Sequence, residues 1–144
     1  MIKAMSLFTI LLIMSGCATG GRVSSNANVQ PVVFDASKSY VYFYRPCLIW
    51  GAVRGIKVYD ENKNIGGLNC STYFIYETNP GGHNFHADDW IRQERILTMA
   101  LEPGKKYFVK TDLRIGLMDA VPSLTLINNL NEDKMNQFRR ISGN

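Results

Sequence analysis

From residue 39 onward, short runs of aromatic and β-branched residues are separated by polar turns, which is the pattern of β-strands. The first run covers residues 40–45 and stops at Pro46. Residues 56–59 and 65–68 flank a polar turn and predict a hairpin, and further strands are expected at 72–77, 83–87, 95–101, 106–111 and 123–127. Short strands at this spacing predict an all-β fold, an antiparallel β-sandwich of about seven strands.

Two Pro-Gly pairs, Pro80-Gly81 and Pro103-Gly104, each precede a predicted strand. Proline fixes φ and glycine accepts a positive φ, so both pairs suit type II turns. The last part of the chain carries helical signals instead, because Asn131 can cap a helix, acidic residues follow it and two arginines come later. We expect a C-terminal helix that closes an open edge or face of the sheet, with an apolar stripe of Met135, Phe138 and Ile141. A partner-binding helix is the alternative.

The amino terminus has the features of an export signal, in the expected order. Lys3 supplies a positive charge, and the apolar run 7–14 is far shorter than the ~20 residues that a membrane-spanning helix needs. Small residues follow in Met14-Ser15-Gly16-Cys17, which resembles the lipobox of bacterial lipoproteins, with Met14 in place of the usual leucine. The sequence therefore predicts cleavage before Cys17 and acylation of its thiol. An ordinary leader with an incidental cysteine is the alternative.

Acyl chains on Cys17 would hold the mature protein on a membrane. Each buried methylene contributes about 0.8 kcal/mol and one chain anchors only marginally, but bacterial lipoproteins resemble one another in carrying two or three chains. The next residue is Ala18 rather than aspartate. By resemblance to the enterobacterial sorting rule, this favours the outer membrane, with the domain facing the periplasm.

The chain thus divides into a lipoprotein signal peptide (1–16), a lipidated tether (17–38) and a β-sandwich domain with a C-terminal helix (39–144). The tether is small and polar at first, and a flexible linker of ~20 residues has a root-mean-square reach of about 25 Å. Val32, Val33 and Phe34 are candidates to dock on the domain.

Cys47 and Cys70 remain once Cys17 is acylated. In the oxidising periplasm such a pair predicts a disulfide, which would stabilise the fold by roughly 3 kcal/mol in the chain-entropy model. The two residues flank predicted strands and could meet at one end of the sheet. Two separate buried thiols are the alternative.

Several segments together carry a family resemblance, namely Tyr40-Val41-Tyr42-Phe43-Tyr44-Arg45-Pro46, Ile65-Gly66-Gly67-Leu68, Tyr73-Phe74, Asn79-Pro80-Gly81-Gly82-His83 and Glu102-Pro103-Gly104-Lys105-Lys106-Tyr107-Phe108-Val109. Their order resembles a family of small bacterial lipoproteins classed as a domain of unknown function, which is similar to PEGA-type β-sandwich modules. The resemblance covers residues 40–127 and implies a β-sandwich on a lipid tether. It implies no reaction.

The composition and the missing motifs argue against several classes of function. The net charge of +4 is modest and spread along the chain, which does not favour nucleic acid as a partner. No Gly-x-Ser-x-Gly elbow, phosphate loop or metal-ligand spacing is present, so we expect no enzyme, cofactor or metal. His83 and His86 should point to opposite faces of one strand and serve structural roles. The acidic pairs Asp60-Glu61 and Asp88-Asp89 are expected in solvated turns.

Trp50 and Trp90 lie beside predicted turns, where an exposed aromatic ring can stack on a sugar or grip a partner. They are the candidate ligand-binding residues, although they could instead cover the ends of the sandwich. The leading hypothesis is a non-enzymatic envelope lipoprotein that serves as an interaction or structural module for an envelope protein or glycan. The alternative is a glycan- or peptide-binding module of the periplasm.

Overall fold

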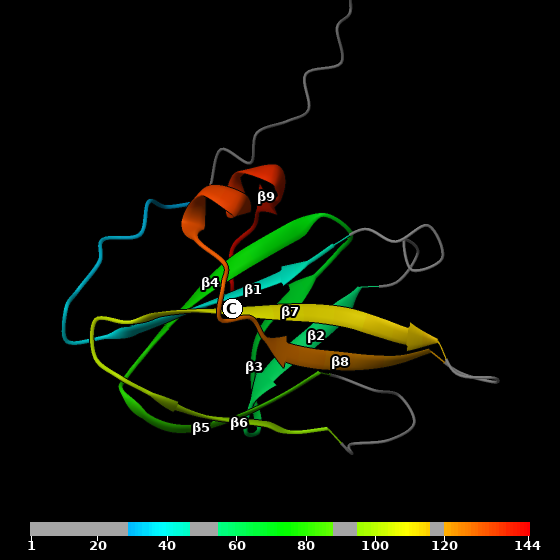
Figure 1. Cartoon of the computed structure of the whole chain (residues 1–144), viewed down its shortest axis with the longest axis horizontal. Coiled ribbons are helices and arrows are strands. Elements are labelled where there is room, and N and C mark those ends of the chain that lie inside the picture. Colours follow the sequence, from blue (N-terminus) through cyan, green and yellow to red (C-terminus); the bar gives the residue numbers. More distant parts are fainter. Residues whose placement is uncertain (1–28, 47–54, 88–94, 116–119) are drawn as a thin grey trace, which may run out of the picture.

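The computed structural model describes residues 29–46, 55–87, 95–115 and 120–144, and these form two β-sheets packed face to face (Figure 1). The five-stranded sheet contains, in spatial order, β8 (Ala120–Leu126), β7 (Lys106–Ile115), β1 (Ser39–Arg45), β4 (Thr72–Thr78) and β9 (Arg139–Arg140). The four-stranded sheet contains β3 (Lys63–Leu68), β2 (Ile56–Asp60), β5 (Gly81–Ala87) and β6 (Leu97–Leu101). The described chain is therefore mostly β and sandwich-like, as the pattern of runs predicts.

The main core lies between the two sheets. Its centre is aromatic: the ring of Phe43 on β1 lies 5.3 Å from that of Phe74 and 5.2 Å from that of Phe85. All three side chains are fully buried, and aliphatic residues from both sheets complete the cluster. Burying side chains of this size is the main favourable contribution to folding, at roughly 25 cal/mol for each Å² of apolar surface removed from water.

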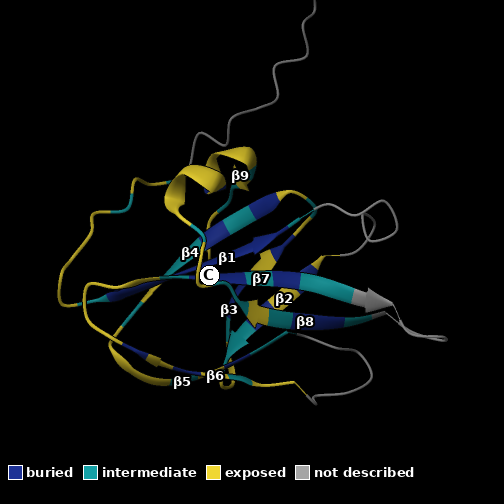
Figure 2. Ribbon diagram, in the orientation of Figure 1, coloured by how far each residue is buried: buried dark blue, intermediate teal, exposed yellow. Residues whose placement is uncertain are grey.

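Strand β1 is buried on both faces (Figure 2). Because side chains alternate along a strand, the tyrosines of β1 point away from the main core. They form a second cluster with one residue of β7 and one of the C-terminal segment: Tyr40, Tyr42, Tyr44, Phe108 and Met135. Val32 and Phe138 pack against this cluster, so residues from both ends of the described chain cover the outer face of the five-stranded sheet.

The expected count of about seven strands and the wholly antiparallel arrangement are both corrected. The described residues form nine strands, and β7 runs parallel to β1, as the short β9 does to β4. The parallel pair arises because the chain crosses from β6 to the other sheet through the Pro103-Gly104 turn. There Gly104 has φ +70° and its N–H donates to the Lys38 carbonyl (2.7 Å) just before β1, so β7 starts at the same end as β1.

The expected C-terminal helix is only a 3-10 helix, η1 (Glu132–Gln137). Asn131 precedes it but makes no side-chain cap, and the Phe138 N–H donates to the Met135 carbonyl, which ends the helix after a few residues. The next N–H group, that of Arg139, donates to the Ser71 carbonyl at 2.8 Å. Pairing with β4 therefore replaces further helical turns. Within the described residues, no helix has the length and apolar character that crossing a membrane requires.

The final residues close one edge of the sandwich, where β4 of one sheet lies near β3 of the other. Ile141 donates its N–H to the Tyr73 carbonyl at 2.8 Å, and Asn144 donates to the Ile65 carbonyl at 3.1 Å. The C-terminal tail thus hydrogen-bonds to both sheets. Such a strap satisfies backbone groups that an open edge would leave exposed to other chains.

Candidate functional site

The most connected polar cluster of the described residues lies where the chain passes from β4 to β5. Asp60 ends β2, His83 is in β5 and Tyr76 is in β4, so the cluster joins the two sheets. His83 Nδ1 lies 2.7 Å from Asp60 Oδ2, and the Tyr76 hydroxyl donates to the same oxygen at 3.1 Å. The second ring nitrogen of His83, Nε2, lies 3.0 Å from the carbonyl oxygen of Asn79.

Both ring nitrogens of His83 face oxygen acceptors, because Nδ1 meets the Asp60 carboxylate and Nε2 meets the Asn79 carbonyl. The ring therefore bridges β2 and the turn that leads from β4 to β5. The ring also stacks on Phe85, with centroids 5.6 Å apart. This geometry favours a clamp between the sheets over acid-base chemistry.

Asp60 is more buried than a turn residue should be. Its side chain is only 10% exposed, and its second carboxylate oxygen, Oδ1, is buried without a hydrogen-bond partner among the described residues. The expected solvated turn at Asp60-Glu61 is therefore wrong for Asp60, although Glu61 is exposed. Burial and the nearby Asp60 carboxylate raise the pKa of Tyr76, which keeps its hydroxyl protonated and donating.

His86 lies on the opposite face of β5, as expected for residues three apart in a strand. Its ring stacks on Tyr59 of β2, with centroids 5.0 Å apart and planes 3° apart, and its Nε2 lies 2.8 Å from the Glu61 carbonyl. Beside this pair, the Thr98 hydroxyl donates to Asn84 Oδ1 at 2.8 Å. The outer face of the four-stranded sheet therefore presents an aromatic pair next to exposed polar groups.

A second polar cluster lies on the outer face of the five-stranded sheet. Glu132 of η1 accepts from the Tyr42 hydroxyl and from Lys106 Nζ, the latter at 2.6 Å. Lys106 Nζ also lies 3.8 Å from the ring centroid of Phe34. Burial alone would raise the pKa of Glu132, but the Lys106 and Tyr42 hydrogen bonds outweigh it and lower that pKa. Burial and Glu132 also raise the pKa of Tyr42. These contacts attach η1 and the N-terminal segment to the sheet.

Residues 29–38 run over this outer face as an ordered segment. Val32 packs on the tyrosine cluster and the Phe34 ring meets Tyr40 edge-on at 4.8 Å, whereas Val33 is 83% exposed. The start of the segment is held by Arg140 of β9, whose guanidinium Nη2 donates to the Gln30 carbonyl at 2.9 Å. The last ten residues of the predicted tether, 29–38, therefore belong to the described domain.

Most of the residues singled out by sequence lie outside the described residues. This holds for the lipidation residue Cys17, for Cys47, and for the candidate ligand-binding residues Trp50 and Trp90. Cys70 is described: it is half-buried in the turn between β3 and β4 and is not a free thiol. In the part of the chain that the structure describes, no group of three or more His, Cys, Asp or Glu side chains could hold a metal ion.

The fold places the described chain in the broad class of all-β, sandwich-like proteins. No protein-family model matches the chain, and no curated protein or solved structure matches it significantly. The family resemblance noted from the sequence motifs therefore stays a prediction.

Sequence reasoning missed the Asp60–His83–Tyr76 cluster because its members are distant in sequence and come from three strands. One signal was available: Asp60 follows Val58 with a spacing of two, so both side chains point to the core side of β2. The same alternation along β5 places His83 beside Phe85 on the inner face.

Proposed function

We propose that the protein is a bacterial envelope lipoprotein, anchored through acyl chains on Cys17, whose β-sandwich acts as a non-enzymatic interaction or structural module. The observation that carries this proposal is the order of signals in the first seventeen residues: Lys3, the apolar run 7–14, the small residues Ser15 and Gly16, then Cys17. The proposed location is the outer membrane, facing the periplasm, because Ala18 follows the cysteine.

The ordered start of the domain supports this proposal. Val29 and Gln30 already belong to the described structure, and Arg140 holds the Gln30 carbonyl, so residues 18–28 would connect the lipid to the domain. A flexible chain of this length has a root-mean-square reach of about 20 Å. That distance is enough to clear the lipid headgroups and too short to let the domain move far from the bilayer.

The engagement of His83 supports a non-enzymatic role for the polar cluster. Both ring nitrogens contact acceptors, and the Tyr76 hydroxyl is used as a donor to Asp60. The cluster therefore holds two sheets together, and we propose binding or structural support as the task of the domain rather than a reaction.

Metabolic labelling with an alkyne-bearing palmitate tests the anchor in cells. We expect the label on the wild-type chain and its loss in Cys17→Ala, which should also leave the leader uncleaved. Cys70→Ala is the matched control and should keep the label. Equal labelling of wild type and Cys17→Ala would contradict the proposal.

A glycan-binding module is the second candidate, and the outer face of the four-stranded sheet favours it. The stacked rings of Tyr59 and His86 offer an apolar surface on which a sugar could stack. Asn84 lies in β5, the strand of His86, and its partner Thr98 lies in the neighbouring β6. Titration with soluble peptidoglycan fragments, followed by NMR, would detect such binding. We expect shifts at these residues that Tyr59→Ala abolishes, whereas Tyr107→Phe preserves them. Trp50→Ala and Trp90→Ala test the residues singled out by sequence.

A further inference from the structure

The charged residues of the sandwich are unevenly distributed between its two ends. Arg139 and Arg140 pair with Thr72 and Tyr73, which lie beside the end of β1. The segments that surround them, residues 134–144 and 69–76, contain no aspartate or glutamate. We call this the tether end, because Arg140 also holds Gln30 there.

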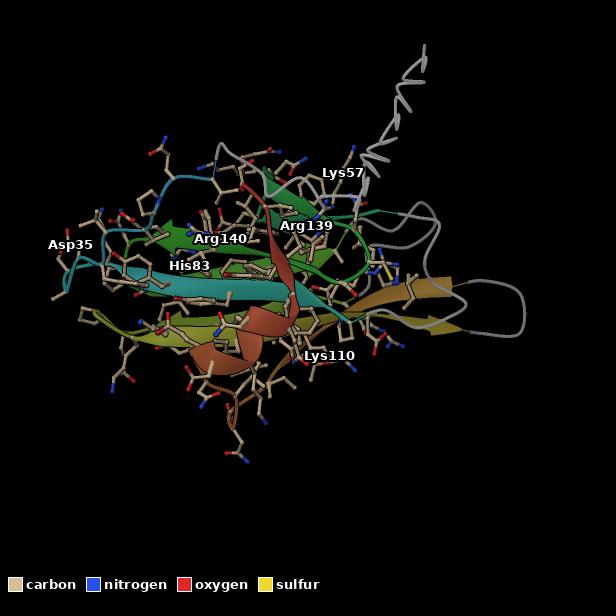
Figure 3. All side chains as sticks on the ribbon, turned by 90° about the horizontal axis from the view of Figure 1, so that it is seen from above. Asp35, Lys57, His83, Lys110, Arg139 and Arg140 are labelled. Carbon is tan, nitrogen blue, oxygen red and sulfur yellow. The ribbon has the colours of Figure 1, made fainter. Side chains whose placement is uncertain are left out.

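The opposite end of the sandwich carries acidic side chains. Glu77 pairs with Tyr40, the Ser39 hydroxyl donates to the Glu102 carbonyl, and the backbone of Asp35 accepts a contact from the Tyr40 hydroxyl. Lys38 and Lys105 lie at this end as well. In Figure 3, Asp35 lies at the left edge of the domain, well away from Arg139. Along β1 the two ends are separated by roughly 16 Å, at ~3.3 Å for each residue.

We propose that the tether end is a membrane-facing surface, with exposed Arg139 contacting anionic phospholipid headgroups. This inference rests on the proposed lipid anchor at Cys17. Two observations carry it. Residues 18–28 have a root-mean-square reach of about 20 Å, less than the domain's diameter of roughly 35 Å, so the face where the tether joins stays near the bilayer. On that face Asp112 is paired with Lys110, which leaves exposed Arg139 as a surplus positive charge, whereas Asp35, Glu77 and Glu102 lie at the other end.

Arg139 is suited to this contact. Arg139 is exposed and free to meet a headgroup, whereas half-buried Arg140 donates its Nη2 to the Gln30 carbonyl and fixes the start of the described chain beside it. A guanidinium binds a phosphate oxygen pair through a planar set of donors. Each basic side chain close to an anionic surface favours the bound orientation by about fivefold, and the effect falls off within a Debye length.

The test uses the acylated mature protein in nanodiscs made of equal parts phosphatidylcholine and phosphatidylglycerol, with a small fraction of lipid that carries gadolinium on its headgroup. Amide signals of residues 72–73 and 139–140 should broaden at least twice as strongly as those of 104–106. Nanodiscs of phosphatidylcholine alone should remove most of this difference. Arg139→Glu should reduce it at least threefold, and Lys105→Gln, an exposed charge at the other end, should leave it unchanged.

The outcomes separate the two proposals. The mass of the reconstituted protein is measured first, and a bare Cys17 overturns the lipid anchor together with this inference. An acylated protein whose two ends broaden equally overturns the orientation alone. The orientation is also overturned if the difference in broadening between the two ends is the same in both lipid compositions, or if it persists in Arg139→Glu.

Discussion

The Nδ1 atom of His83 lies 2.7 Å from Oδ2 of Asp60, and this contact joins β5 to the end of β2. His83 follows the Asn79-Pro80 corner at which the chain leaves the five-stranded sheet. Because its other nitrogen faces the Asn79 carbonyl, the ring holds the corner and the strand together. The pair therefore stabilises the arrangement of the two sheets.

Removing His83 should destabilise the domain. In His83→Gln one amide nitrogen cannot reach both the Asp60 carboxylate and the Asn79 carbonyl, which the two ring nitrogens contact from opposite sides of the imidazole. We expect a loss of about 2 kcal/mol, because a largely buried polar contact is broken. Urea unfolding of the mature chain, with Cys17→Ser as a soluble background, measures this loss.

A double-mutant cycle separates the pair from its surroundings. We expect Asp60→Asn to cost a similar amount and the double variant to cost much less than the sum, with a coupling energy of about 1 kcal/mol or more. Additive losses would show that the two residues act independently. His86→Gln, which lies on the outer face of β5, is the matched control for loss of an imidazole.

The strands of the sandwich could be predicted from the sequence, whereas their partners could not. Runs such as residues 40–45 alternate between two sets of large side chains, which predicts a strand buried on both faces. The parallel pairing of β1 with β7 depends on a crossover between sheets, which no local pattern encodes. The polar cluster was missed for the same reason, because Asp60, Tyr76 and His83 meet only in the folded chain.

The C-terminal segment shows how tertiary pairing overrides local propensity. Asn131, Glu132 and Asp133 form a good helix start by sequence, yet η1 ends at Gln137. Arg139 then pairs with β4, and Phe138 packs on Tyr44 with ring centroids 5.2 Å apart. Packing against the five-stranded sheet therefore decides the conformation.

Glu132 should make stability depend on pH in the acid range. Its pKa is lowered from the ordinary 4.5, so the stability it contributes is fully present above about pH 4.5 and is lost as the pH falls through its folded-state pKa. We expect Glu132→Gln to be less stable than wild type at pH 7, with the difference shrinking below pH 4. Urea unfolding across this pH range measures it.

The neighbouring carboxylate provides the control for this prediction. Asp133 is exposed on the same turn, and Asp133→Asn should change stability by less than about 0.5 kcal/mol at any of these pH values. A difference between wild type and Glu132→Gln that is constant with pH would show that the Lys106 and Tyr42 contacts do not depend on the charge of Glu132.

Gly66 is expected to be intolerant of any side chain. It has φ +156°, and a Cβ atom there would lie 2.9 Å from the ring of buried Phe74. We expect Gly66→Ala to cost about 2 kcal/mol or more, since both backbone strain and overpacking contribute. Gly67→Ala is the adjacent control: its nearest neighbouring atom is 3.8 Å away, and the change should be within about 0.5 kcal/mol. Equal effects of the two changes would contradict this explanation.

We predict a disulfide between Cys47 and Cys70. Cys70 is not a free thiol, and the strand pair Arg45–Thr72 brings together two residues that each lie two positions from one of these cysteines. Alkylation of the unreduced, unfolded mature chain should leave both residues unmodified, and prior reduction should expose both. Alkylation of either one without reductant would disprove the bond.

The most direct measurement is the intact mass of the mature protein extracted from cell membranes, with the N-terminal peptide identified by fragmentation. The account predicts a chain that begins at Cys17 and carries two or three acyl chains on that residue. A chain that begins elsewhere, or a Cys17 without acyl groups, would contradict it.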